Sequence, residues 1–200
     1  MSKSIFFVYD SHCPWSYATT PLINAIVEAF PDIEINLWHA GRYEGDENIS
    51  TKTLAAVEDD SKTTFTQAYK DQKLNAADST IAANIMAWFS HKDPVKALEF
   101  LSAMQHEHFE KGNSLKESDD YHALISKFKL SLPKKALSKD KYTKDAEFVF
   151  SDIEELQEII GTKSIPALLF ANNDDLILLN HNLYLKEPSA IVDAIKLELK

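Results

Sequence analysis

The sequence predicts an α/β fold in which a helical block interrupts the part of the chain that forms the sheet. Short apolar stretches that are typical of buried strands lie near both ends of the chain, but not in its middle. The middle, residues 44–147, carries several amphipathic helical patterns and no convincing strand. The predicted order is therefore strand–helix–strand, a helical block, and then helix–strand–strand–helix.

The first half of the predicted sheet is a strand–helix–strand unit. Residues 4–9 (SIFFVY) are aromatic, apolar and β-branched, like a buried strand. A helical pattern starts at Pro14 and ends before Pro31, and Pro21 inside it is expected to kink the helix. Residues 33–39 (IEINLWH) alternate between apolar and polar and predict a second strand. The two strands of such a unit pair in parallel by default.

The helical block carries clear start and stop signals. Asp93 followed by Pro94 predicts the beginning of a helix, and Gly112 predicts an end. The large aromatic residues are expected to form the core of this block; they are Trp88, Phe89, Phe100 and Phe109. Because the histidines have no zinc-like spacing, we expect solvated helix faces rather than a metal site; these residues are His91, His106, His108 and His122.

The α/β pattern resumes after the block. Residues 145–161 form an amphipathic helical pattern that closes at a glycine. Residues 167–171 and 176–180 flank the sequence NNDD and predict a hairpin, which a last helix follows. The predicted division is a sheet domain of residues 1–43 and 148–200, with an inserted all-helical domain of residues 44–147.

Composition and charge exclude several classes of protein. The chain is 44% hydrophobic and 26% charged, which is typical of a soluble globular protein. The net charge of −10 argues against nucleic-acid binding, and no apolar stretch is long enough to span a membrane. The short apolar run near the amino terminus lacks the features of a secretory signal. We therefore expect a cytoplasmic protein, and a homodimer is left open.

The only cysteine lies in the stretch DSHCPWSY, where the first helix begins. Unpaired backbone N–H groups and the helix dipole stabilise a thiolate at this position, so we predict a pKa of Cys13 below the ~8.5 of a free thiol. Pro14 suits the first helical position, which has no use for its missing N–H. Ser16 can donate a hydrogen bond to the sulfur but cannot resolve a mixed disulfide. The pattern therefore predicts exchange with an external thiol.

The neighbours of Cys13 each have two interpretations. His12 either polarises the thiol or merely follows the strand. Trp15 either belongs to the core or forms the half-exposed wall of a groove. Pro166 is either an ordinary proline at a strand edge or a cis-proline, and we predict the cis form, lying against Cys13. A lone cysteine is in general more often a small buried hydrophobe than a nucleophile.

Two motifs give this layout a resemblance to a known family. CPWS follows the first strand and opens the first helix, as the CxxC active site does in the thioredoxin fold. SIPALLF places Pro166 just before a strand, where that fold carries a cis-proline facing the active-site cysteine. The chain therefore resembles the DsbA-like thioredoxin superfamily, and in particular the FrnE-type oxidoreductases, whose motif is CPWC. The related kappa-class glutathione transferases and 2-hydroxychromene-2-carboxylate isomerases share the architecture and typically have serine at the first motif position.

The resemblance implies a thioredoxin-like fold with a helical insertion and a thiol–disulfide oxidoreductase that works with one thiol. Cys13 would be the nucleophile, and Ser16 and His12 would tune it. The residues implied to contact the substrate are Pro14, Trp15, Ile165 and Pro166. Glutathione is the implied co-substrate, with no tightly bound cofactor and no metal. Two alternatives stay open, a glutathione-dependent transferase or isomerase and a thiol-binding protein without catalysis.

Overall fold

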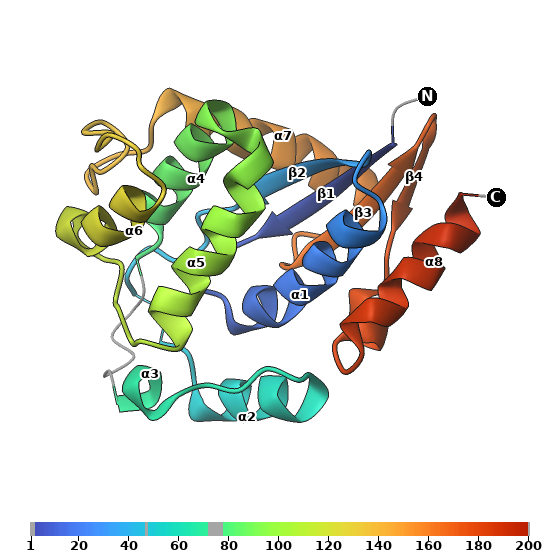
Figure 1. The fold of residues 1–200 in the computed structure, drawn as a ribbon, viewed down its shortest axis with the longest axis horizontal. Coiled ribbons are helices and arrows are strands. Elements are labelled where there is room, and N and C mark those ends of the chain that lie inside the picture. Colours follow the sequence, from blue (N-terminus) through green and yellow to red (C-terminus); the bar gives the residue numbers. More distant parts are fainter. Residues whose placement is uncertain (1–2, 47, 72–77, 200) are drawn as a thin grey trace.

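The computed structural model describes residues 3–46, 48–71 and 78–199, and a four-stranded mixed sheet lies at its centre (Figure 1). The strands are β1 (Lys3–Tyr9), β2 (Glu34–His39), β3 (Ala167–Asn172) and β4 (Asp175–Leu178). They lie in the order β2-β1-β3-β4, with β1 parallel to β2 and antiparallel to β3, which is antiparallel to β4. The predicted parallel unit and the predicted hairpin are therefore confirmed.

Helices cover both faces of the sheet (Figure 1). On one face α1 packs against α8, and α7 lies against β2 and packs on the other face. The alternation of side chains along β1 explains this arrangement, because Ile5 and Phe7 join the core under α1 whereas Val8 joins the core under α7. The helices concerned are α1 (Pro14–Ala29), α7 (Lys144–Ile160) and α8 (Ile191–Glu198). α1 continues through Pro21, and the left-handed Gly161 ends α7.

The helical block consists of α2 (Thr51–Asp60), α3 (Gln67–Asp71), α4 (Thr80–Lys92), α5 (Ala97–Phe109) and α6 (His122–Lys127). Short 3₁₀ turns precede α5 and α6, namely η1 (Pro94–Lys96) and η2 (Ser118–Tyr121). Ser61 ends α2, because its backbone is extended and its hydroxyl donates to the Val57 carbonyl (2.6 Å). Asp93 caps the turn before α5, as predicted, by accepting a hydrogen bond from the Lys96 N–H.

The helical block and the sheet share one continuous core. Phe89, Phe100 and Phe109 are fully buried in it together with Ile5 and Phe7 of β1, and Trp88 packs against its edge. The predicted junction between residues 147 and 148 falls inside α7. In the part of the chain that the structure describes, no helix is long and apolar enough to cross a membrane.

Candidate active site

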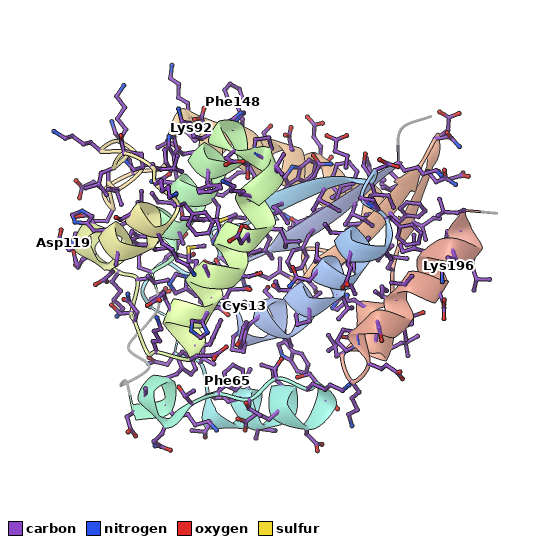
Figure 2. All side chains as sticks on the ribbon, in the orientation of Figure 1. Cys13, Phe65, Lys92, Asp119, Phe148 and Lys196 are labelled. Carbon is purple, nitrogen blue, oxygen red and sulfur yellow. The ribbon has the colours of Figure 1, made fainter. Side chains whose placement is uncertain are left out.

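Cys13 occupies the N-cap position of α1, at the end of the loop that leaves β1 (Figure 2). The Cys13 N–H donates to the Asp10 carbonyl (3.1 Å), and the Cys13 carbonyl accepts the N–H of Tyr17 (2.9 Å). α1 contacts both α2 and α5 of the helical block. The thiol therefore lies where the sheet-forming half of the chain meets the inserted helices.

The thiol is not activated by its position alone. Cys13 is 5% exposed, and this burial raises the pKa of its thiol above the ordinary value, with the negative charge of Asp10 acting in the same direction. Hydrogen bonds from the backbone and hydroxyl of Ser16 and from Tyr43 lower the pKa, but they do not compensate. The prediction of a lowered pKa is therefore wrong. The helix terminus favours the thiolate, but the loss of hydration in the packed interior outweighs that effect.

Ser16 is fully buried next to the thiol. Its Oγ accepts the N–H of Asp10 (3.3 Å), which leaves the hydroxyl hydrogen free to point at the Cys13 sulfur. The interaction of Ser16 with the thiol lowers the pKa of Cys13, in agreement with its predicted role as a hydrogen-bond donor.

Tyr43 supplies a second hydroxyl to the sulfur, and the motif analysis missed it. Its side chain hydrogen-bonds to Cys13, and burial together with the nearby thiol raises the pKa of Tyr43, so its hydroxyl stays protonated. Its backbone is fixed by Ser79, whose N–H donates to the Tyr43 carbonyl (2.9 Å). The Ser79 hydroxyl in turn donates to Asp10 Oδ2 (2.7 Å). Tyr43 is thus tied to the loop that carries the thiol.

Asp10 is a fully buried carboxylate at the centre of this arrangement. It accepts hydrogen bonds from the backbone N–H groups of His12 (2.8 Å) and Arg42 (2.7 Å) and from the hydroxyl of Ser79 (2.7 Å). Burial by itself would raise the pKa of Asp10, but the nearby side chains of His39 and His12 and the hydrogen bond from Ser79 bring it well below its usual range. Asp10 is therefore ionised, and it joins the loop after β1 to the segment after β2.

His12 lies on the buried side of the loop. Its Nδ1 is 3.2 Å from Ser11 Oγ and 3.7 Å from Asp10 Oδ1, and its ring packs edge-on against His108, with centroids 4.4 Å apart. Within the described residues it forms no hydrogen bond or ion pair with Cys13. The geometry thus links His12 to the buried network, and direct tuning of the thiol stays a prediction.

His108 corrects the expectation that the histidines of the helical block lie on solvated faces. It is 4% exposed, its Nδ1 lies 2.8 Å from the Asn113 carbonyl, and its ring packs against Tyr69. Positions i and i+2 of a helix face different ways, so His106 points outward and pairs with Glu110 while His108 points inward. Burial lowers the pKa of His108, which keeps the ring neutral.

A cavity of about 670 Å³ opens beside the first turn of α1, and Trp15, Ile165 and Pro166 all line it. Trp15 is half-buried, so it forms part of a groove wall while still packing on the core. The Ile165–Pro166 peptide bond is cis, as predicted. Pro166 directly precedes β3, which pairs with β1, the strand that leads to Cys13. Contact between the proline and the sulfur stays a prediction.

Segments far apart in the sequence form the other walls of this cavity. They contribute Asp60, Ser164, His181, Asn182, Leu183, Leu185 and Lys186. Pro14 is buried at the first position of α1 and is not among the lining residues, so its expected contact with substrate is not seen in this cavity. In the described ranges no group of His, Cys, Asp or Glu could hold a metal ion.

The sheet order, the cysteine at the start of α1, the cis-proline before β3 and the inserted helices define a DsbA-like thioredoxin fold. Solved structures agree with this assignment. The cytosolic disulfide reductase DsbM from Pseudomonas aeruginosa, solved with GSH, is 18% identical, with 98% of each chain covered and a TM-score of 0.82. A probable DsbA oxidoreductase from Streptomyces coelicolor is 10% identical, with 98% of this chain and 91% of that chain covered and a TM-score of 0.65.

A third solved structure, the oxidoreductase DsbA from Xylella fastidiosa, is 11% identical to this chain. The alignment covers 99% of this chain and 86% of that chain, with a TM-score of 0.56. No protein-family model and no curated protein matches the sequence. At these levels of identity the likeness establishes the fold, and the chemistry has to be argued from the site.

Proposed function

We propose that this chain is a thiol–disulfide oxidoreductase that acts through the single thiol of Cys13, with glutathione as its small-thiol partner and no tightly bound cofactor. The observation that carries the proposal is the cysteine at the start of α1, which receives hydrogen bonds from Ser16 and Tyr43. Two further features support it: the nearby cavity that Trp15 and Pro166 line, and the fold shared with a cytosolic disulfide reductase solved with GSH.

The proposed reaction has two exchange steps. In the first, the Cys13 thiol gives up its proton and the sulfur attacks a disulfide. A new S–S bond forms to Cys13, the original S–S bond breaks, and the leaving thiolate takes up a proton. In the second step the thiolate of glutathione attacks the substrate sulfur of the mixed disulfide. A disulfide between glutathione and the substrate forms, the S–S bond to Cys13 breaks, and Cys13 leaves as a thiolate that takes up a proton. This step needs an external thiol because Ser16 carries no sulfur.

The two hydroxyl groups have the same role in both steps. Ser16 and Tyr43 hydrogen-bond to the Cys13 sulfur when it is negatively charged, both as the attacking group and as the leaving group. Because burial raises the pKa of Cys13, most of the thiol is protonated at neutral pH, and these donors limit that penalty. We also place the protein in the cytoplasm, where thiol buffers keep a lone cysteine reduced.

The decisive experiment is the intact mass of the protein after incubation with oxidised glutathione. We expect wild type to gain one glutathionyl group and to lose it again when reduced glutathione is added. The Cys13→Ser variant should gain none. A wild-type protein that stays unmodified under conditions where the thiol is accessible to a small alkylating reagent would contradict the proposal.

The burial of Cys13 favours one second candidate, a glutathione-dependent transferase. In that reading the hydroxyl of the half-buried Tyr43 stabilises the thiolate of bound glutathione instead of that of the cysteine. The two candidates differ in their need for Cys13. Conjugation of glutathione to an electrophile such as 1-chloro-2,4-dinitrobenzene should survive Cys13→Ser if the transferase reading holds, and should be absent in both proteins if it does not.

A further inference from the structure

A groove of about 930 Å³ runs along the outer edge of β2 and shares no residue with the cavity beside Trp15. All residues from 33 to 39 line this β2 groove, one after another. Because successive side chains of a strand point to opposite faces of the sheet, a groove that touches every residue has to follow the strand's edge. β2 is the first strand of the sheet, and within the described residues it pairs with β1 alone. Its outer row of backbone N–H and carbonyl groups therefore faces the groove.

The two walls of the β2 groove come from α4 and α7. The small residues Ala83 and Ala87 of α4 leave room in it, and the hydroxyl of Ser90 is buried there with no hydrogen-bond partner in the part of the chain that the structure describes. Val95 in η1 and Phe148 in α7 also line the groove, and they are 91% and 70% exposed. Exposed apolar side chains that gather at a groove are typical of interaction sites.

The carboxylates give the β2 groove one sign of charge. Glu34, Asp145 and Asp152 line it, are exposed, and form no ion pair within the described residues. No lysine or arginine is among the lining residues. The groove therefore complements a cationic ligand. A second copy of this chain is a poor occupant, because its net charge of −10 would bring acidic groups against acidic groups.

We infer that the β2 groove binds an extended segment of a partner protein in which apolar residues alternate with lysine or arginine. The segment adds a strand to the sheet, and its backbone pairs with the outer edge of β2. Its apolar side chains pack on Val95 and on the α4 wall. Its basic side chains point at α7, where their stems cover Phe148 and their charged ends reach Asp145 and Asp152. The interaction does not use Cys13, so it goes beyond the proposed exchange reaction.

Calorimetric titration with the blocked peptide Lys-Val-Lys-Val-Lys-Val tests this docking. We expect binding that weakens as salt is added. Phe148→Ser should weaken binding by about tenfold through the loss of a buried aromatic contact, and Asp152→Asn by about threefold through the loss of an exposed ion pair. Ile159→Ser and Glu155→Gln are matched controls that should bind like wild type, because both side chains are exposed on α7 and neither lines the groove.

Methylation of the peptide nitrogens tests the pairing with β2. In an added strand the N–H groups of alternate residues face the neighbouring strand, and a methyl group in their place prevents the hydrogen bond. One peptide is methylated at its valines and a second at its lysines. We expect one of the two to keep binding and the other to lose it. Loss in both peptides, or in neither, overturns the addition of a strand.

Three further results decide the inference. The absence of binding to wild type, or equal weakening by the groove variants and their controls, overturns it. A dimer of wild type that Phe148→Ser, but not Ile159→Ser, converts to a monomer in sedimentation velocity also overturns it, because a second copy then occupies the groove. Binding of the peptide by Cys13→Ser as tightly as by wild type supports it, and this measurement keeps a failure of docking apart from a failure of thiol exchange.

Discussion

Two regions near the start of α1 differ in access and in hydrogen bonding. On one side is the cavity beside Trp15, whose charged residues Asp60 and Lys186 are exposed and carry no ion pair within the described residues. On the other side Asp10 and His39 are buried and are held by groups from several distant segments. The buried region around Asp10 holds the loop that carries the thiol. The open cavity instead presents charged side chains that form no ion pair within the described residues.

The buried region also keeps its histidine neutral. Backbone N–H groups of Ser11 and Gly41 point at the two ring nitrogens of His39, each at 3.1 Å. A neutral imidazole accepts one of these two N–H groups, whereas an imidazolium ring carries a proton on both nitrogens and accepts neither. Burial lowers the pKa of His39 to about 4, although the negative charge of Asp10 acts in the opposite direction. The difference between the regions is therefore also a difference in response to pH.

The largest change in chemistry is expected from Ser16→Cys, which adds a second thiol three residues after Cys13 in α1. Residues i and i+3 on the first turn of a helix are close enough to bridge, because disulfides need Cα atoms about 4.4–6.8 Å apart. The variant should lose two hydrogens on oxidation and should reduce insulin, whereas wild type should do neither without added glutathione.

Thr20→Cys is the control for this variant, because Thr20 is buried one helical turn further along α1, beyond bridging distance. A variant that bridges at positions 13 and 16 but shows no turnover would mean that the open cavity does not accept disulfide substrates. Turnover by wild type in the absence of glutathione would contradict the single-thiol mechanism itself.

The next effect is a loss of stability in mild acid that originates in the buried region. The folded protein keeps His39 neutral down to about pH 4, whereas the unfolded chain binds the proton near pH 6.5. The stabilising contribution is therefore complete above about pH 6.5 and is lost as the pH falls toward 4. The free energy of unfolding should drop by about 2 kcal/mol between pH 7 and pH 5 from this residue alone.

Urea unfolding at pH 7, 6 and 5 measures this slope. His39→Gln should flatten it, even if the variant is less stable at every pH. His91→Gln is the control, since that side chain is exposed near the end of α4 and forms no ion pair within the described residues, and this variant should keep the wild-type slope. If the His39 variant keeps the wild-type slope, the acid sensitivity does not come from this ring.

The part of the site formed by Cys13, Trp15 and Pro166 was predictable from the sequence, because the motifs that indicate it are local. A strand pattern followed by CPWS at a helix start, and IP before a second strand, were enough to place Cys13, Trp15 and the cis-proline. The turn between β3 and β4 was equally local, since Asn173 adopts the left-handed conformation that such turns require.

The buried network around Asp10 was not predictable from the sequence, because it joins residues that are far apart along the chain. The hydrogen bond from Ser79 to Asp10 joins positions 69 residues apart, and it acts together with the bond from the Arg42 N–H to Asp10 to hold the segment of Tyr43 near the thiol. His108 resembled any surface histidine of an amphipathic helix. The predicted pKa of Cys13 was wrong for the same reason. The stabilisation of a thiolate at a helix terminus can be read from the local sequence, whereas the burial that raises the pKa depends on how the whole chain packs.

The smallest effect is expected from Tyr43→Phe, which keeps the aromatic ring but removes the hydroxyl that hydrogen-bonds to the Cys13 sulfur. The loss of a hydrogen bond to the thiolate should raise the pKa of Cys13 further, since such bonds to charged groups contribute roughly 1.5 kcal/mol. Alkylation by iodoacetamide, measured across the pH range, should show a midpoint at higher pH and a rate at pH 8 that is roughly tenfold lower.

Tyr142→Phe is the matched control, because that hydroxyl donates to the Gly41 carbonyl (3.3 Å) rather than to the sulfur. A purely structural role of Tyr43 would change the stability of the protein but not the midpoint of the alkylation profile. A shift in the Tyr43 variant alone therefore identifies its hydroxyl as a partner of the thiolate. An unchanged midpoint would leave Ser16 as the only one of the two hydroxyl groups that acts on the Cys13 thiolate.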